Sequence, residues 1–127
     1  MVTCPRSNQA LGVGTAPVPQ LMAQGIPVAL GTDSLASAPD LDLFAEMAAL
    51  IADHPGLSPA AVLRLATLNG AHALGLADRL GSLAPGKLAR ATVVALPDPE
   101  DDPLEVVCSV PADVWPLDRA PWEAVQL

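Results

Sequence analysis

The sequence predicts an α/β protein, and three observations support this prediction. Residues 1–32 have the pattern of a strand, a loop, a helix and a strand, a β-α-β unit whose strands should be parallel. Between residues 40 and 53, apolar residues recur at helical spacing, as on a helix that packs against a sheet. Apolar residues make up 51% and charged residues 16% of the 127 residues, which indicates a buried chain rather than a disordered one.

The first half of this unit consists of a strand over residues 1–4 that Pro5 stops. Arg6-Ser7-Asn8 is predicted to form a polar loop. A short helix follows, with Thr15 as its N-cap and Gly25 as the residue just beyond its end.

The second strand, residues 27–32, leads into the most informative stretch of the chain. Residues 27–30 carry no charge, as expected of a strand that is buried on both faces, and Gly31 allows the backbone to turn. Asp33 then stands at the carboxyl end of a parallel strand, where α/β barrels and open α/β sheets place their reactive groups. Asp33 is therefore the leading candidate for a catalytic residue.

Helices are expected next, followed by a change of pattern near residue 80. Asp40 is predicted to cap a helix that ends at His54-Pro55-Gly56. Ser58-Pro59 opens another helix, Asn69-Gly70 interrupts it, and residues 71–74 form a last short helix.

Strands are expected in the last third of the chain. Residues 91–96 form a β-branched strand, and residues 104–110 are a second strand candidate after an acidic, proline-rich loop. Residues 111–127 stay unassigned.

Charge and cysteine content exclude several classes of protein. Fourteen acidic and six scattered basic residues give a net charge of −8, so we expect no nucleic-acid partner. The sequence has no long apolar run and no signal-peptide pattern at its N-terminus, so we expect a cytoplasmic chain with no membrane partner. Cys4 and Cys108 lack metal-binding spacing and are expected to be reduced thiols.

Five motifs that occur in order carry a resemblance to a known family. They are Cys4-Pro5-Arg6-Ser7-Asn8, Leu30-Gly31-Thr32-Asp33-Ser34, Leu57-Ser58-Pro59, the stretch from Ala66 to Leu76, and the stretch from Gly81 to Lys87. Together they resemble the amidohydrolase superfamily of metal-dependent hydrolases. The most similar branch is the aminohydrolase and chlorohydrolase branch, with the cytosine, guanine and S-adenosylhomocysteine deaminases.

The resemblance implies a fold and a chemistry. Residues 1–80 would be the C-terminal part of a (β/α)8 TIM barrel, strands seven and eight with their helices, and residues 81–110 would add strands to a small β-sandwich. In this family the Asp after strand eight binds a divalent metal, zinc or iron, and takes a proton from the water that the metal activates. Both roles fall on Asp33. The reaction is hydrolysis of a non-peptide C–N bond, such as deamination of an amino-purine or amino-pyrimidine.

Four other residues flank the expected site. Ser7 and Asn8 resemble the loop after strand seven, where they contact the substrate or brace the strand-eight turn, and we favour bracing. Thr32 and Ser34 either hydrogen-bond to Asp33 in support of the metal site or cap the following turn, and both alternatives stay open.

The chain also departs from the family pattern. Typical members supply four histidines to the metal site, whereas this sequence has only His54 and His72, which we expect at the surface or in caps. Arg90 stands where relatives usually have Asp.

A complete barrel needs about 250 residues. We therefore expect a C-terminal fragment that needs the missing N-terminal barrel segment as a partner and binds no metal alone. It would act on a small-molecule substrate only within the complete enzyme. The sequence is compatible with an oligomer. The alternative is a catalytically dead remnant that serves as a structural or interaction module.

Overall fold

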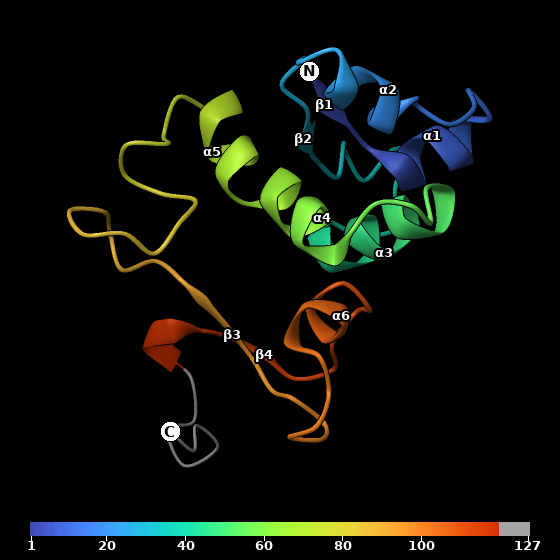
Figure 1. Ribbon diagram of the computed structural model, residues 1–127. Coiled ribbons are helices and arrows are strands. Elements are labelled where there is room, and N and C mark those ends of the chain that lie inside the picture. Colours follow the sequence, from blue (N-terminus) through green and yellow to red (C-terminus); the bar gives the residue numbers. More distant parts are fainter. Residues whose placement is uncertain (120–127) are drawn as a thin grey trace.

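The computed structural model describes residues 1–119, and the end of the unassigned tail, residues 120–127, lies outside the described part (Figure 1). Within residues 1–119 no helix has the length and hydropathy needed to cross a membrane. The elements in chain order are β1 (Val2–Thr3), α1 (Pro5–Leu11), α2 (Val18–Ala23), β2 (Ala29–Leu30), α3 (Leu43–Asp53), α4 (Pro59–Ala66), α5 (Leu68–Ala73), β3 (Thr92–Val94), α6 (Pro103–Val107), β4 (Val114–Pro116) and the 3₁₀ turn η1 (Leu117–Arg119).

Strands β1 and β2 pair in parallel, which confirms the predicted β-α-β unit. The backbone N–H of Gly31 donates to the carbonyl of Thr3 at 2.9 Å, and Thr3 lies opposite Leu30. The paired part of β2 is shorter than the predicted strand of residues 27–32, because α1 begins at Pro5 and leaves β1 only two residues long.

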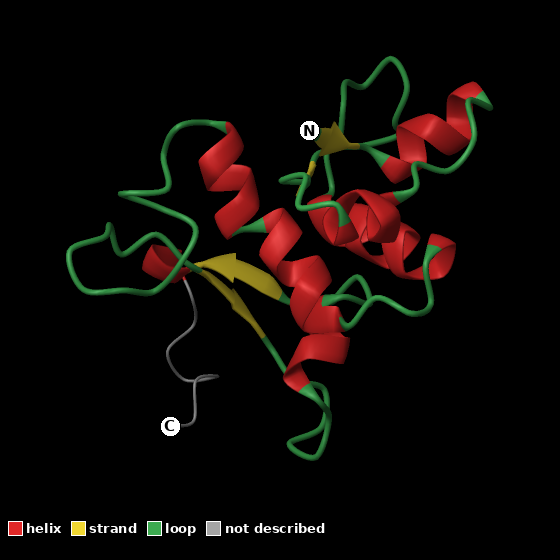
Figure 2. Cartoon of the chain, turned by 45° about the horizontal axis from the view of Figure 1, so that its top comes forward, coloured by secondary structure: helices red, strands yellow, loops and turns green. Residues whose placement is uncertain are grey.

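The core lies where α3 and α4 pack on β2 (Figure 2). Strand β2 and the residue before it are buried, as expected of a strand covered on both faces. The largest fully buried apolar side chains come from these elements and from α2. They are Leu50, Leu65, Val18, Val28 and Val62.

The prediction of a polar loop at Arg6-Ser7-Asn8 was wrong, since these residues lie in α1. Pro5 occupies the first helical turn, where its fixed φ suits a helix and its missing N–H costs no hydrogen bond. The predicted N-cap at Thr15 was also wrong, because α2 begins after Pro17 without a side-chain cap. Gly25 follows the end of α2 in the left-handed region, φ 73°, as predicted.

The cap of α3 is Asp42 rather than the predicted Asp40. The Asp42 side chain accepts hydrogen bonds from the backbone N–H groups of Phe44 at 2.8 Å and Ala45 at 3.3 Å. Asp40 and Asp42 both precede this helix, and the sequence alone favoured Asp40 as the N-cap. The predicted end of α3 at His54 and the Ser58 cap of α4 are both confirmed.

Asn69 and Gly70 lie inside α5, so the predicted interruption there was wrong. The break between α4 and α5 falls instead at Thr67, where φ is −115° and ψ −86°. The Asn69 side-chain amide donates to the Val28 carbonyl beside β2 at 2.7 Å, and this tertiary bond compensates for a weak helix former.

The predicted second strand over residues 104–110 was wrong, because residues 103–107 form α6. Asp102 caps this helix by accepting from the Leu104 N–H at 2.8 Å, and Pro103 opens its first turn. The actual partner of β3 is β4, in the stretch that sequence analysis left unassigned. The two strands are antiparallel, with Val93 opposite Trp115.

Candidate functional site

The candidate site is built around Asp33, which follows β2 and is exposed. Its φ of 60° lies in the left-handed region, which is uncommon for a residue other than glycine. Gly31, two residues earlier, packs closely on β1, since a Cβ there would lie 2.9 Å from Val2 Cγ1. The tight approach of the strands and the left-handed turn together place the carboxylate at the carboxyl end of the sheet.

Two serine hydroxyls hold the Asp33 carboxylate. Ser7 Oγ donates to Asp33 Oδ2 at 2.7 Å, and Ser37 Oγ donates to the same oxygen at 2.9 Å. The two hydroxyl oxygens lie 2.9 Å apart, so the three oxygens form a small triangle. Ser7 comes from the first turn of α1 and is buried, whereas Ser37 comes from the loop after β2.

These hydroxyls lower the pKa of Asp33, first through Ser7 and then through Ser37, with a further contribution from the Ser34 backbone N–H. Hydrogen bonds to the charged form of a carboxyl favour that form. At neutral pH the side chain is therefore an anion, with the hard oxygen atoms that suit a divalent metal ion.

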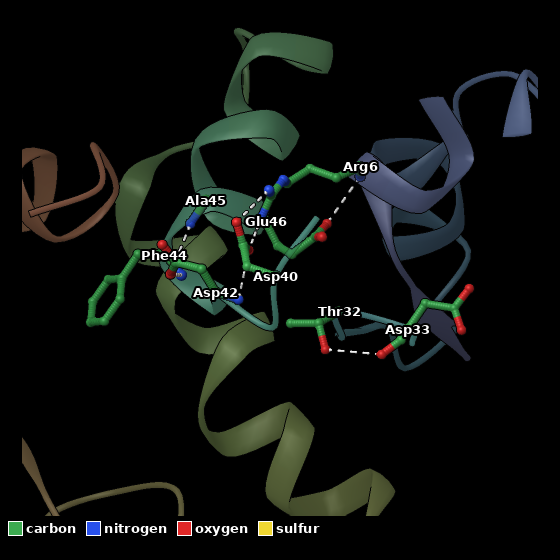
Figure 3. Close-up of polar contacts among 8 residues, drawn as sticks. All are labelled: Arg6, Thr32, Asp33, Asp40, Asp42, Phe44, Ala45 and Glu46. Carbon is green, nitrogen blue, oxygen red and sulfur yellow. Dashed lines mark hydrogen bonds and ion pairs between the residues drawn. The ribbon is translucent and has the colours of Figure 1, made fainter. Parts of the chain in front are cut away.

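The other predicted site residues lie nearby. Thr32 Oγ1 donates to the backbone carbonyl of Asp33 at 3.2 Å (Figure 3), and Ser34 Oγ accepts from the Ala36 N–H at 3.4 Å. Both hydroxyls thus bond to the backbone of the turn, the arrangement of the turn-capping alternative. Asn8 is half-buried in α1, and its backbone N–H donates to the Cys4 carbonyl.

The loop after Asp33 is tied to α1 by an ion pair (Figure 3). The Arg6 guanidinium donates to both carboxylate oxygens of Asp40, at 2.6 and 3.0 Å. This bidentate contact lowers the pKa of Asp40 to about 2. The Arg6–Asp40 pair and the Ser7–Asp33 hydrogen bond hold the two ends of residues 33–40 against the start of α1.

Two further residues near Asp33, Ser37 and Glu46, were not among the predicted site residues. Ser37 lies four positions after Asp33, a spacing that brings two side chains together only if the chain turns between them. Glu46 is fully buried in α3, and its Oε2 accepts the Arg6 backbone N–H at 3.0 Å. The available signal was that Glu46 is an acidic residue beside the apolar positions Leu43, Met47 and Leu50 of the α3 stripe.

The histidines lie in the expected settings. His54 lies at the end of α3, where its Nε2 is 2.9 Å from the Ala16 carbonyl. His72 is exposed on α5. Within residues 1–119, no group of three or more His, Cys, Asp or Glu side chains is arranged to hold a metal ion. Cys4 and Cys108 are free thiols, as predicted, and burial raises the pKa of both.

Two open clefts border the helices. The larger, about 730 Å³, is an apolar cleft between α3, α4 and the β3–β4 pair, and Asp33 does not line it. The smaller, about 460 Å³, begins at Leu30, Gly31 and Thr32 and runs along α5. Of these two clefts, the smaller adjoins the Asp33 turn.

Comparison with known proteins gives a consistent result. A family model described as the amidohydrolase family matches residues 1–121. The 5-methylthioadenosine/S-adenosylhomocysteine deaminase of Teredinibacter turnerae is 42% identical over 111 residues, which cover 82% of this chain and 25% of that protein.

Solved structures agree with this match. An adenosine deaminase from Xanthomonas campestris with bound zinc aligns with a TM-score of 0.78 and 37% identity, over 91% of this chain and 30% of that one. The E. coli guanine deaminase aligns with a TM-score of 0.68 and 30% identity, over 76% of this chain and 24% of that one. The chain thus spans about a quarter of the length of the curated relatives it matches.

Proposed function

The chain belongs to the amidohydrolase family, and from this premise we propose that it is the C-terminal part of a metal-dependent hydrolase. Its relatives include deaminases of 5-methylthioadenosine, S-adenosylhomocysteine and guanine, which supports hydrolytic deamination as the class of reaction. The substrate would be a small molecule with an amino-purine or similar ring. The observation that carries this proposal is the Asp33 carboxylate, held by Ser7 and Ser37 at the carboxyl end of β2.

In this proposal β1 and β2 are the seventh and eighth strands of a (β/α)8 barrel, and residues 1–80 are its C-terminal segment. Their parallel pairing across a helical connection supports this, because barrel strands pair in that way. Residues 81–110 begin the β-sandwich. Because β3 pairs with β4, the sandwich part would also include residues 111–116.

Asp33 would be both a metal ligand and the group that accepts a proton. A divalent zinc or iron ion, when bound, supplies a water activated for attack on carbon. The relative from Xanthomonas campestris has bound zinc, which favours that metal. The exposed, anionic Asp33 carboxylate fits this role because its geometry is already held by Ser7 and Ser37.

The described residues fit the metal only in part. Catalytic zinc sites normally use three protein ligands, and among residues 1–119 Asp33 stands without two further ligands beside it. The other ligands would therefore come from the N-terminal barrel segment, which is the partner that this proposal requires. Residues 1–127 alone would bind no metal and release no ammonia.

The roles of the neighbouring residues follow from their contacts. Ser7 would brace the Asp33 turn, since its hydroxyl is buried and bonded to the carboxylate. Thr32 and Ser34 would stabilise the same turn through its backbone. For Asn8, which follows Ser7 in α1, the family resemblance alone supports a place near the bound substrate.

A chimera tests this function. Residues 1–127 would replace the matching segment of the Teredinibacter turnerae deaminase, and we would measure zinc content and ammonia release from 5-methylthioadenosine, guanine and an amino-pyrimidine. We expect stoichiometric zinc and turnover of at least one ring. Asp33→Asn should lower turnover by about 10²-fold or more and weaken zinc binding, because the substituted amide is neutral and a poor proton acceptor.

The matched control is Asp53→Asn, which changes an α3 carboxylate that accepts a hydrogen bond from Gln9 Nε2 at 3.3 Å. It should leave zinc content and turnover as in the unchanged chimera. A folded chimera that keeps full turnover with Asp33→Asn would refute the role of Asp33. A folded chimera that holds no zinc and releases no ammonia would instead favour a catalytically dead remnant.

A further inference from the structure

Helix α1 begins without a cap of its own. The first N–H groups of a helix have no partner within the helix and are usually bound by a side chain at the N-cap. Here the N-cap residue is Cys4, and its side chain makes no capping hydrogen bond. The Arg6 N–H instead donates to Oε2 of Glu46 at 3.0 Å, and Glu46 lies in α3, 40 positions later in the chain.

Glu46 occupies this position at an energetic cost. The residue is 0% exposed, and its second oxygen, Oε1, has no hydrogen-bond partner among the described residues. Burial raises the pKa of the carboxyl group, as expected when a charge is removed from water. An apolar side chain at this position of α3 would avoid the cost of burying a charge. The hydrogen bond from the Arg6 N–H is the interaction that offsets this cost.

The contact with Arg6 leads directly to the candidate site. Ser7 is the next residue in the same helical turn, is 2% exposed, and donates to Asp33 Oδ2 at 2.7 Å. A hydrogen bond of this length depends on where the first turn of α1 sits relative to β2. Of the two ends of α1, the Glu46 bond fixes the end that carries Ser7.

We propose that Glu46 is a positioning residue that caps α1 from α3 and thereby holds the Ser7 hydroxyl on Asp33. Its importance for turnover rests on the proposed function of Asp33. The positioning itself requires neither metal nor substrate, so the two proposals can fail separately.

Nuclear magnetic resonance of the full 127-residue chain tests the inference. In the unchanged chain we expect a protected Arg6 amide and three-bond couplings that report one Ser7 rotamer. Glu46→Leu should speed exchange of the Arg6 amide about tenfold, as expected for loss of a helix cap, and should average the Ser7 couplings. Glu46→Gln keeps an acceptor oxygen and should preserve both signals, although it removes the charge.

A second α3 carboxylate offers the matched control. Asp53 Oδ1 accepts from Gln9 Nε2 at 3.3 Å, so it also links α3 to α1 but at the opposite end of the helix. Asp53→Leu should leave the Arg6 amide and the Ser7 rotamer unchanged. If Glu46→Leu does not fold, Glu46→Asp takes its place, because the shorter side chain keeps the charge but falls short of Arg6.

Three results would overturn the inference. The first is a fixed Ser7 rotamer with a protected Arg6 amide in Glu46→Leu or Glu46→Asp. The second is loss of both signals in Glu46→Gln, and the third is the same loss in Asp53→Leu. None of these results depends on whether the chimera binds zinc.

Discussion

The Ser7 hydroxyl donates a 2.7 Å hydrogen bond to the Asp33 carboxylate, joining the first turn of α1 to the turn after β2. The two residues are 26 positions apart in the sequence and meet because β1 and β2 are parallel and adjacent. Polar residues that follow neighbouring parallel strands gather at one edge of a sheet. The contact is therefore a direct product of the β-α-β arrangement.

Removing the Ser7 hydroxyl should raise the pKa of Asp33. Ser7 is the largest cause of the lowered pKa and Ser37 the next, so Ser7→Ala should raise it more than Ser37→Ala. A carbon-detected magnetic resonance titration of the Asp33 carboxyl measures both. Ser109→Ala, which removes a hydroxyl bonded to Val106 in α6, is the control and should change nothing. An unchanged Asp33 pKa in Ser7→Ala would contradict the 2.7 Å hydrogen bond.

The Arg6–Asp40 pair should stabilise the chain except in acid. The pKa of Asp40 falls from 3.8 to about 2 on folding, so its contribution is present above pH 3.8 and is lost as pH falls towards 2. Asp40→Asn should therefore be less stable than the unchanged chain at neutral pH, with a difference in unfolding free energy that shrinks below pH 3.8.

Urea unfolding at a series of pH values measures this difference. The Asp40 side chain is 52% exposed, so the difference should be small and should shrink further in about 1 M salt. A difference that stays constant from neutral pH to pH 2 would show that the ion pair does not form in solution.

Two glycines with nearly the same φ separate backbone strain from crowding. A Cβ at Gly81, φ +86°, would lie 2.7 Å from Ala71 Cβ and 2.9 Å from Leu68 Cα, whereas a Cβ at Gly86, φ +87°, would meet nothing within 4 Å. Gly86→Ala should lower the free energy of unfolding by about 1 to 2 kcal/mol through the left-handed backbone alone.

Gly81→Ala should cost about 1 to 3 kcal/mol more than Gly86→Ala, because the added methyl group has no space. Urea unfolding of both variants measures the two effects side by side. Equal losses would mean that the chain after α5 does not pack on that helix in solution.

Leu50 should be among the most important residues of the core. Its side chain is 1% exposed in the cluster between α3, α4 and β2. Leu50→Ala should lower the free energy of unfolding by about 2 to 5 kcal/mol through lost burial and the cavity that remains. Leu83→Ala is the matched control: Leu83 is 84% exposed, so its truncation should change stability by less than about 0.5 kcal/mol. Similar losses in both variants would contradict the assignment of the core.

Much of the fold could be predicted because its signals are local. The apolar stripe of α3, the Ser58 cap of α4 and the uncharged residues before Asp33 are each visible within a few residues. The parallel pairing of β1 with β2 follows from the helical segment between them. The position of Asp33 at the strand end therefore needed no knowledge of tertiary contacts.

The wrong predictions concern short segments whose residues are compatible with two kinds of secondary structure. Residues 103–107 contain the β-branched pair Val106-Val107, which favours a strand, but Asp102 and Pro103 start a helix and decided the outcome. Ser7 lies two residues after Pro5, which was expected to stop a strand and in the structure opens α1. Glu46 escaped notice because its partner is a backbone N–H in a distant helix, and no local pattern encodes such a contact.

The bond between Arg6 and Glu46 also sets an order of assembly. Helix α1 leaves the ribosome before α3 exists, so its first turn stays without this partner until residue 46 has been made and α3 has formed. Contacts between residues distant in the chain are slow to form because the intervening loop must close first. The serine hydroxyl that braces Asp33 is thus secured only after α3 has formed, although Ser7 precedes that helix in the chain.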